Sequence, residues 1–335
     1  IVIGVGEGGN GFTLGERVAS NGPHAEVVSV PQNLVAKVPD NVSNDAGAFT
    51  VIGAIGLQGV RLAKPELGET FVVVGLGLIG QITAQLLLAH GCRVIGFDFD
   101  RAKVELASRF GILAVAAGSE VDVVKHVESL TAGVGCDGVV ITASTQSNEV
   151  IAQAAQMSRK RGRIVLVGVI GLNINRADFY EKELTFQVSC SYGPGRYESA
   201  YEEKGLDFPV AFVRWTENRN FQAVLEAMAR GALKVEELIT RRVPLANFGE
   251  IYDNMGGAGL GSVLIYKERS AASSDGAAGG PATVPVIPPT GSKSAHASIL
   301  KMSDRQFGPN DGAIAIVGAG NFTKMAALPA LVAAN

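Results

Sequence analysis

Hydrophobic runs alternate with amphipathic stretches through the middle of the chain, from Thr70 to about residue 168. The short runs are rich in valine and isoleucine and predict buried strands, whereas the longer stretches have apolar positions at helical spacing. We predict strands at 72–75, 93–98, 112–115, 138–142 and 162–168, and helices at 81–91, 101–110, 121–130 and 147–160. Strands that alternate with helices imply right-handed crossovers, so the predicted fold class is α/β with a doubly wound parallel sheet.

The first 45 residues show a different pattern, of short strands and turns. We predict strands at residues 1–6 and 24–30, the second ended by Pro31, and a turn that leads into a strand at 11–18. A helix is predicted from Ser43 to about Leu62, with Ser43 or Asn44 as its cap. Residue 1 is an isoleucine inside a strand pattern, and a helix begins near the last residue. We therefore expect the sequence to be a segment of a longer protein.

After residue 190 the pattern changes again. A helix is predicted at 221–228 and a closing strand at 263–266. Residues 270–309 are rich in Ser, Ala, Gly and Pro, which predicts a flexible linker. A second strand–glycine–helix opening follows, with a strand at 313–317, glycines at 318 and 320, and a helix at 324–331.

The main chemical motif is Gly75-x-Gly77-x-x-Gly80, which comes directly after the strand at 72–75 and opens a helix. In a dinucleotide-binding turn the first glycine permits the turn, the second admits the pyrophosphate, and the third lets helix and strand pack closely. The phosphates sit at the helix N-terminus. Asp98 follows Gly80 by 18 positions, near the spacing of a carboxylate that binds the adenosine ribose. The alternative is an ordinary glycine-rich turn with a surface aspartate.

Asp98 favours NAD(H) over NADP(H), because a carboxylate repels a 2′-phosphate. Arg101 lies three residues further on and could instead reach a phosphate if Asp98 turned away. We expect NAD as the cofactor.

Composition excludes several classes of protein. The chain has 335 residues, of which 47% are hydrophobic and 18% charged, and a formal charge of −3. This balance argues against nucleic acid as a partner. No uninterrupted apolar stretch reaches the ~18 residues of a membrane span, and no secretory leader is visible. Cys92, Cys136 and Cys190 are scattered, which suggests reduced thiols in a cytoplasmic protein.

In combination, the segments at 11–18, 38–43, 48–54, 135–137 and 162–168, with the glycine motif and Asp98, resemble the medium-chain, zinc-type alcohol dehydrogenase family. The resemblance covers residues 1 to about 268 and lacks the family's N-terminal part. It implies a Rossmann NAD-binding domain at residues 56–190. Parts of a GroES-like, β-rich catalytic domain would occupy residues 1–55 and 191–268. The resemblance also implies a homodimer.

The sequence departs from this family at the metal. Zinc members use a Cys and a Gly-His-Glu segment that would precede Ile1, and a further ligand that would fall near Val51 or Ala54. Neither of these side chains can bind zinc. The cysteine loop of the structural zinc is missing, and His24 and His90 form no ligand pair. We therefore predict no metal in this chain.

The motif and the resemblance together indicate the cofactor contacts. Lys103 would place a cation near the adenosine ribose, and Gln58 would lie near the nicotinamide ring. A packing role is the alternative for each side chain. The candidate cofactor-binding residues are Gly75, Leu76, Gly77, Leu78, Ile79, Gly80, Asp98, Phe99, Arg101, Lys103, Thr142, Ala143, Val167, Gly168, Val169, Ser189, Cys190 and Gln58.

The second opening resembles the start of the glucose-fructose oxidoreductase and inositol dehydrogenase family. The order of segments, with a linker at 269–311 and this opening at 312–335, resembles bacterial bi-domain oxidoreductases linked to polysaccharide and sugar metabolism. The resemblance implies a small sugar-like substrate.

The leading hypothesis is a zinc-independent, NAD-dependent dehydrogenase or reductase acting on an alcohol or carbonyl, in particular a sugar or sugar nucleotide. No catalytic residue is assigned. Tyr192 and Lys182 are candidates for the proton donor, and a solvated charge is the alternative for Lys182. Two other hypotheses stay open: an NADPH-dependent enone or quinone reductase, and a dinucleotide-binding scaffold or sensor without turnover.

Overall fold

The computed structural model describes residues 1–6, 9–25, 27–253 and 259–266. The chain divides into two compact units, one of residues 1–246 with 257–267 and one of residues 247–256 with 268–335. In the second unit, α10 (Gly249–Tyr252) lies within the described part of the chain. The predicted linker at 269–311 and the second opening at 312–335 lie outside the described residues.

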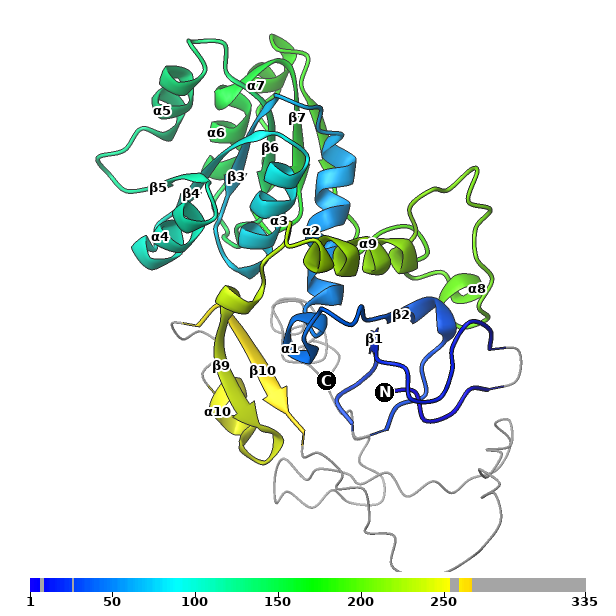
Figure 1. Cartoon of the computed structure of the whole chain (residues 1–335). Helices are drawn as coiled ribbons and strands as arrows, with labels where there is room; N and C mark the ends of the chain where they lie inside the picture. Colours follow the sequence, from blue (N-terminus) through cyan, green and yellow to red (C-terminus); the bar gives the residue numbers. More distant parts are fainter. Residues whose placement is uncertain (7–8, 26, 254–258, 267–335) are drawn as a thin grey trace, which may run out of the picture. The chain divides into compact units, whose positions relative to one another are not determined.

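The centre of the first unit is a six-stranded sheet in the order β5-β4-β3-β6-β7-β8 (Figure 1). All of its neighbouring strands pair in parallel. Its strands are β3 (Thr70–Val74), β4 (Arg93–Asp98), β5 (Leu113–Ala116), β6 (Cys136–Ile141), β7 (Ser158–Leu166) and β8 (Thr185–Val188). This order has its reversal between β3 and β6 and confirms the predicted doubly wound α/β fold.

Alternate residues of each central strand enter different hydrophobic clusters, one on each face of the sheet. On β3, Val73 belongs to one cluster and Val72 to the other, and on β7 the same holds for Val165 and Ile164. This alternation follows from the period of two along a strand. The crossover helices are α3 (Leu78–Ala89), α4 (Arg101–Arg109), α5 (Val123–Leu130), α6 (Glu149–Met157) and α7 (Arg176–Tyr180).

The predicted helix at 147–160 is wrong at its end, because α6 stops at Met157 and β7 begins at Ser158. The polar run that starts at Ser158 gives no strand pattern in the sequence. Ser158 nevertheless pairs with Cys136, and the register then shifts. Arg161 has a φ of 61°, so the start of β7 is irregular rather than helical. The edge strand β8 was not predicted from the sequence.

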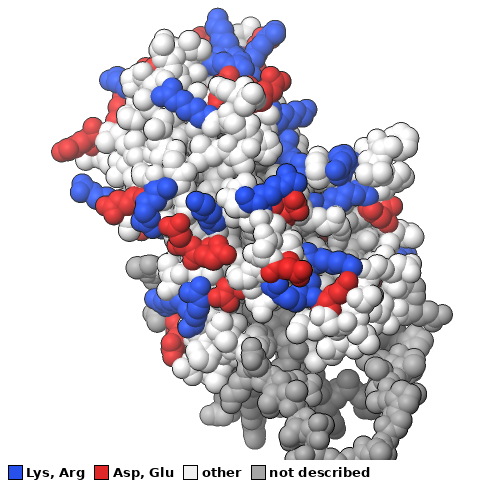
Figure 2. All heavy atoms as spheres, viewed as in Figure 1, with Lys and Arg blue, Asp and Glu red and all other residues white. Residues whose placement is uncertain are grey.

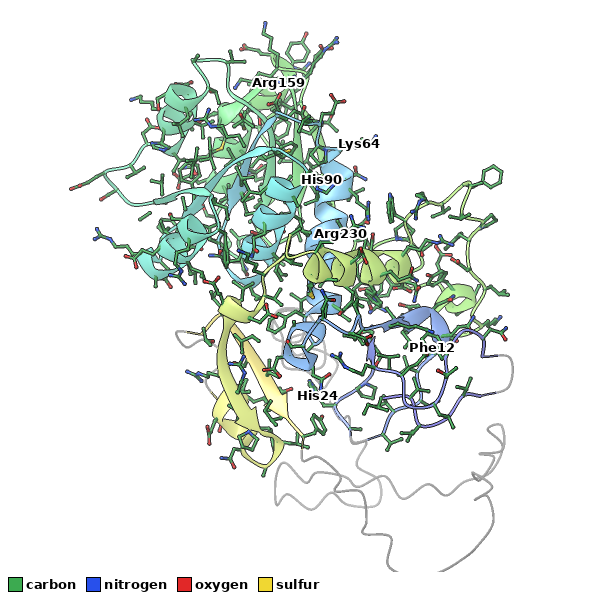
Figure 3. The ribbon with its side chains drawn as sticks, viewed as in Figure 1. Phe12, His24, Lys64, His90, Arg159 and Arg230 are labelled. Carbon is green, nitrogen blue, oxygen red and sulfur yellow. The ribbon has the colours of Figure 1, made fainter. Side chains whose placement is uncertain are left out.

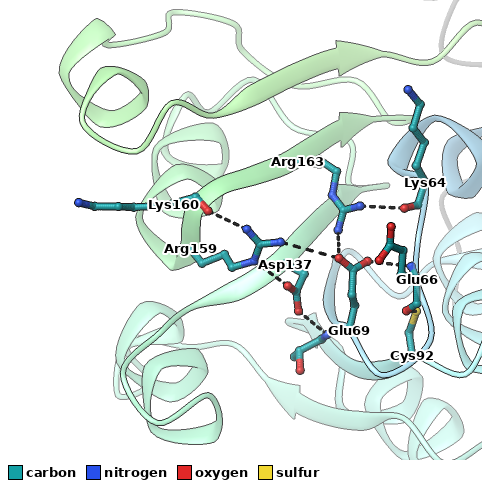
Figure 4. A network of polar contacts seen from close by, with 9 residues as sticks. Lys64, Glu66, Glu69, Cys92, Asp137, Arg159, Lys160 and Arg163 are labelled. Carbon is teal, nitrogen blue, oxygen red and sulfur yellow. Dashed lines mark hydrogen bonds and ion pairs between the residues drawn. The ribbon is translucent and has the colours of Figure 1, made fainter.

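A polar network ties together the amino-terminal edge of the sheet (Figure 4). Asp137 accepts a hydrogen bond of 2.7 Å from the Thr70 amide and one of 2.6 Å from Arg159 Nε, so it joins the starts of β3, β6 and β7. Arg163 pairs with Glu69 and donates to the Lys64 carbonyl at 2.7 Å. This edge is therefore held by its own charges and lies opposite the predicted cofactor site.

The segment before the sheet contains β1 (Val18–Ser20), which pairs antiparallel with β2 (Val35–Lys37), and the helices α1 (Asn44–Gly47) and α2 (Thr50–Ala63). Ser43 caps α1 as predicted, and its Oγ accepts from the Ala46 amide at 3.0 Å. α2 continues past α9 to the start of the sheet (Figure 1).

The strands predicted at 1–6 and 24–30 are wrong for the described residues of these segments, which are irregular. Val2 makes backbone bonds to Gly15 and Glu16, but the glycines that follow it weaken a strand. Pro23 and Pro31 flank the second segment, and proline cannot donate to a strand ladder.

The segment after β8 contains helices and a small sheet, and one of these helices packs against the N-terminal segment. α8 (Ser199–Glu202) precedes α9 (Glu217–Ala229), which packs on α2 and β2. β9 (Ile239–Pro244) pairs in parallel with β10 (Gly261–Ile265). On the face shown in Figure 2, acidic and basic side chains are interspersed. No helix within the described part of the chain has both the length and the apolar character needed to cross a membrane.

Candidate functional site

The glycine turn between β3 and α3 is shaped by two glycines that allow no side chain. Gly75 has a φ of 92°, and a Cβ there would lie 2.7 Å from the Ala143 amide nitrogen. A Cβ at Gly80 would overlap the carbonyl oxygen of Gly75. Leu76, between them, is fully buried. The fold itself therefore requires Gly75 and Gly80.

Gly77 is different, because a Cβ at this position would meet no heavy atom within 4 Å. Its φ of −64° and ψ of −173° are open to any residue, and it caps α3. Leu78 and Ile79 lie in the first turn of α3. The backbone amides of a first turn have no partner within the helix and can therefore bind an anion. The open space at Gly77 thus fits the close approach of a pyrophosphate.

Asp98 ends β4 beside this turn. Its Oδ2 accepts from the Leu76 amide at 2.7 Å and its Oδ1 from the Asp100 amide at 2.9 Å. A carboxylate has about four acceptor positions, so these bonds leave two for ribose hydroxyls. The carboxylate is thus held in place at the edge of the sheet where the turn lies.

The residues that follow Asp98 are more exposed. Phe99 is 84% exposed. Arg101 is exposed and makes no ion pair within the described part of the chain. Lys103 lies 3.6 Å from the Asp100 carboxylate, and its carbonyl accepts from Gln81 Nε2. Arg101 is therefore the more available of these two cations for a phosphate.

The ends of β6 and β7 lie beside the turn. Thr142 Oγ1 donates to the Gly75 carbonyl at 2.6 Å, so this side chain is used to fix the turn. The Ala143 carbonyl accepts from the Val169 amide at 3.1 Å, and a Cβ at Gly168 would overlap that carbonyl. Val167 packs against Gly59 of α2.

The remaining candidates lie after β8 and on α2. The Ser189 hydroxyl is buried and has no hydrogen-bond partner among the described residues, as expected for a group that would face a ligand. Cys190 is exposed and free. Gln58 is buried, and its Oε1 accepts from Asn220 Nδ2 at 3.3 Å.

The two proton-donor candidates lie in different surroundings. Lys182 Nζ donates to the carbonyls of Ala155 and Ser158, at 3.1 and 2.8 Å, where α6 ends. It therefore caps a helix at the amino-terminal edge of the sheet, away from the glycine turn. Tyr192 is buried, and its hydroxyl accepts from Asn21 Nδ2 at 2.6 Å. Burial raises the pKa of Tyr192 to about 12, so its phenol is protonated at neutral pH.

No zinc site is formed by the described residues, where no group of three or more His, Cys, Asp or Glu is placed to hold a metal ion. Thr50, Val51 and Ala54 of α2 offer no such ligand. His24 lies in the N-terminal segment and His90 at the end of α3, well apart in Figure 3. The residues present do not fit a zinc ion.

A cavity of about 330 Å³ lies in the N-terminal segment and contains none of the predicted cofactor residues. Its lining includes Arg17, Asn44, Thr50 and Val51, from the start of β1 to the start of α2. It adjoins the part of α2 where the resemblance implies the catalytic domain.

Two buried polar residues of α9, Asn220 and Glu217, were not predicted from the sequence. Asn220 of α9 is fully buried; its Nδ2 donates to the Tyr192 carbonyl at 2.8 Å, and its Oδ1 accepts from Arg61 Nε at 2.7 Å. Glu217 is also fully buried, and neither carboxylate oxygen has a partner among the described residues. Both residues follow the helical pattern of α9 as polar positions, which gave no sign of burial.

Several known proteins are similar to this chain over part of its length. The family model described as "Zinc-binding dehydrogenase" matches residues 79–208. The D-guloside 3-dehydrogenase of Escherichia coli (strain K12) is 29% identical over 251 residues, covering 72% of this chain and 67% of that protein.

The structure of 2R,3R-butanediol dehydrogenase from Bacillus subtilis has a TM-score of 0.57 at 23% identity, and covers 69% of this chain and 60% of that one. A structure from Sinorhizobium meliloti 1021, bound to NADP, has a TM-score of 0.54 at 24% identity, with 70% and 63% covered. This chain therefore spans less than two thirds of the length of these two solved structures.

The chain is therefore similar to zinc-binding dehydrogenases over part of its length, and it shares the fold of the solved structures. The homologues are named dehydrogenases, which supports an oxidoreductase.

Proposed function

We propose that this chain binds NAD(H) and belongs to an oxidoreductase that moves a hydride between nicotinamide and the alcohol or carbonyl carbon of a sugar-like substrate, without zinc. The observation that carries the proposal is the open space at Gly77, at the N-terminus of α3 and beside the carboxylate of Asp98. The names of the relatives, a guloside and a butanediol dehydrogenase, support a polyol or sugar as substrate.

The protein would hold the cofactor with groups already in place. The N-terminus of α3 would bind the pyrophosphate, and the Asp98 carboxylate would bind the ribose hydroxyls. The buried Ser189 hydroxyl would contact the nicotinamide half of the cofactor. A bound nicotinamide would donate or accept the hydride. Tyr192 is our candidate proton donor, because its hydroxyl accepts from Asn21 and does not use its own hydrogen in that bond. The burial that raises its pKa to about 12 opposes release of this proton, so the reaction would have to place a strongly basic alkoxide against it. The cytoplasmic location and the homodimer stay predictions.

The second candidate is an NADPH-dependent reductase, which the exposed Arg101 favours because it makes no ion pair with any residue that the structure describes. A paired titration with NADH and NADPH separates the two, read by energy transfer from tyrosines and Trp215 to the bound nicotinamide. Tighter binding of NADH supports Asp98 as the ribose ligand. Tighter binding of NADPH would favour Arg101 as a ligand of the 2′-phosphate, and the reductase over the NAD-dependent dehydrogenase.

The variant Gly77→Ala tests the site itself. The methyl group meets no atom of the protein, so we expect unchanged thermal unfolding but NADH affinity lowered by about tenfold or more, since the methyl takes space needed by the pyrophosphate. Gly4→Ala is the matched control, because its Cβ also meets nothing within 4 Å and it lies in the N-terminal segment, outside the glycine turn. Normal NADH affinity in Gly77→Ala, or no binding by the parent chain, would refute the proposed site.

A further inference from the structure

Two arginines stack on the only tryptophan of the chain. The guanidinium carbon of Arg61 lies 3.3 Å from the centroid of the Trp215 ring, and that of Arg214 lies 3.9 Å from it. Arg61 comes from α2 and the other two from the segment before α9, so residues far apart in sequence build this Arg–Trp cluster. Each contact is a cation–π interaction, in which a guanidinium is attracted to the electron-rich face of the indole ring.

The charge of the Arg–Trp cluster is not neutralised. Neither Arg61 nor Arg214 has an ion pair with a carboxylate in the parts of the chain that the structure describes. Nearby arginines behave differently, because Arg196 pairs with Glu202 and Arg219 with Asp207. Each guanidinium lies within 4 Å of the ring centroid, too close for both to share one face, so the two lie on opposite faces of the indole. The charge of Arg214 lowers the pKa of Arg61, so an anion at the edge of the ring that contacts both guanidinium groups would be bound favourably.

Arg61 is positioned rather than free. It is half-buried, and its Nε donates to Asn220 Oδ1 at 2.7 Å, which orients the guanidinium and leaves both terminal nitrogens for a ligand. Burial, and to a smaller extent the charge of Arg214, lower the pKa of Arg61 to about 10. The side chain still carries its positive charge at neutral pH.

The Arg–Trp cluster is linked to the proposed cofactor site. Gln58 precedes Arg61 by three residues on α2, so the two side chains share a helix face. Asn220 donates to Gln58 Oε1 and accepts from Arg61 Nε, and thereby holds both. A substrate that reaches the nicotinamide side near Gln58 would therefore extend toward two arginines.

We propose that the Arg–Trp cluster of Arg61, Arg214 and Trp215 is an anion subsite that binds the phosphate group of a phosphorylated sugar or polyol substrate. The inference rests on the proposed function, since it names the substrate class of that site. Two positive charges match the −1.5 to −2 charge typical of a phosphate monoester, and guanidinium groups bind its oxygens in pairs. A carboxylate carries one charge and matches the pair less well.

Trp215 reports on this subsite without any turnover, because it is the only tryptophan and touches both arginines. The full chain is titrated with sorbitol 6-phosphate, sorbitol and gluconate at constant ionic strength, and the emission of Trp215 is followed. We expect a saturable change with sorbitol 6-phosphate, none with sorbitol and weaker binding of gluconate. No saturable change, or gluconate binding as tightly as the phosphate, would overturn the proposal.

Variants separate binding from folding. Arg214→Gln removes an exposed side chain and should weaken sorbitol 6-phosphate binding by about tenfold, as for loss of a charge-assisted hydrogen bond, with thermal unfolding unchanged. Arg61→Gln should weaken it at least as much. Arg230→Gln is the control, since Arg230 is exposed and pairs with Glu226. Equal affinity in parent and Arg214→Gln overturns the subsite. NADH affinity, measured in the same samples, tests the proposed function separately.

Discussion

At the scale of single residues, each of the three glycines in the turn after β3 is needed for its own physical reason. Gly75 and Gly80 are required by backbone and neighbouring atoms, whereas Gly77 has room for a side chain that no protein atom opposes. A motif read from sequence treats the three alike. The structure separates those that serve the fold from the one that a ligand would require.

Glu217 shows a second residue-scale conflict, between burial and charge. It is fully buried at the start of α9, and its carboxylate has no hydrogen-bond partner among the described residues. Burial, helped by the charges of Glu202 and Glu198 and opposed by that of Arg196, raises the pKa of Glu217 to about 8. The side chain is therefore protonated in the folded protein at neutral pH.

A raised folded-state pKa makes stability depend on pH. Between its usual pKa of 4.5 and about 8, the folded chain holds a proton on Glu217 that the unfolded chain releases, so stability falls as pH rises through this window. Glu217→Gln should flatten this fall and raise the free energy of unfolding at pH 8.5 by about 1–3 kcal/mol, because it removes a buried unpaired charge.

Urea unfolding of the parent and of Glu217→Gln at pH 5.5, 7 and 8.5 measures this. Glu105→Gln, an exposed position of α4, is the control and should keep the pH dependence of the parent. An identical slope in Glu217→Gln and the parent would contradict the assignment.

At the scale of elements, the two edges of the parallel sheet have opposite roles. At the amino-terminal edge, Asp137 binds the Thr70 amide and Arg159, so the starts of β3, β6 and β7 are joined by charge. At the carboxyl-terminal edge lie the glycine turn, Asp98 and the open space at Gly77. One edge is closed by its own polar groups and the other leaves groups for a ligand.

This division predicts separate effects of mutation. Asp137→Ala leaves the Thr70 amide and Arg159 without their acceptor, so we expect a loss of about 1–3 kcal/mol in the free energy of unfolding. NADH affinity of the folded variant should be unchanged, because the substitution lies at the opposite edge. Glu120→Ala, at an exposed turn, is the control for the denaturation series. Weaker NADH binding by folded Asp137→Ala would argue against independent edges.

At the scale of the first unit, segments that precede and follow the parallel sheet in the sequence pack against one long helix, α2. α2 contacts α3 and α9, and it also contacts the sheet through β6 and β7. Its face carries Gln58 and Arg61, and at its start Thr50, Val51 and Ala54 offer no zinc ligand. Chemistry at this site would therefore depend on side chains from several segments and not on a metal held by α2.

At the scale of the whole molecule, we predict that this chain does not require zinc. We expect that EDTA or 1,10-phenanthroline leaves the melting temperature and the NADH affinity of this chain unchanged, and that added zinc gives no rise in melting temperature, because a ligand stabilises only when it binds the folded state. Differential scanning fluorimetry with and without chelator measures this, with magnesium as the control ion. A zinc-specific rise in melting temperature would refute it.

The alternating strands and helices from Thr70 onward, the cap at Ser43 and the position of Asp98 at a strand end were predictable from the sequence, because local periodicity and turn residues specify them. The start of β7 and the edge strand β8 were not, since their pairing with distant strands overrides a polar local pattern. The strands expected at 1–6 and 24–30 failed because glycine and proline weaken them.

The sequence by itself determined the α/β class, the glycine turn and the absence of zinc-binding side chains at Val51 and Ala54, because each depends on residue types at short range. Only the tertiary structure decided that Lys182 caps α6, that Asn220 joins Gln58 to Arg61, and that Glu217 is buried without a partner. These facts depend on which distant segments pack together, and burial and pairing of polar groups follow from packing rather than from local pattern.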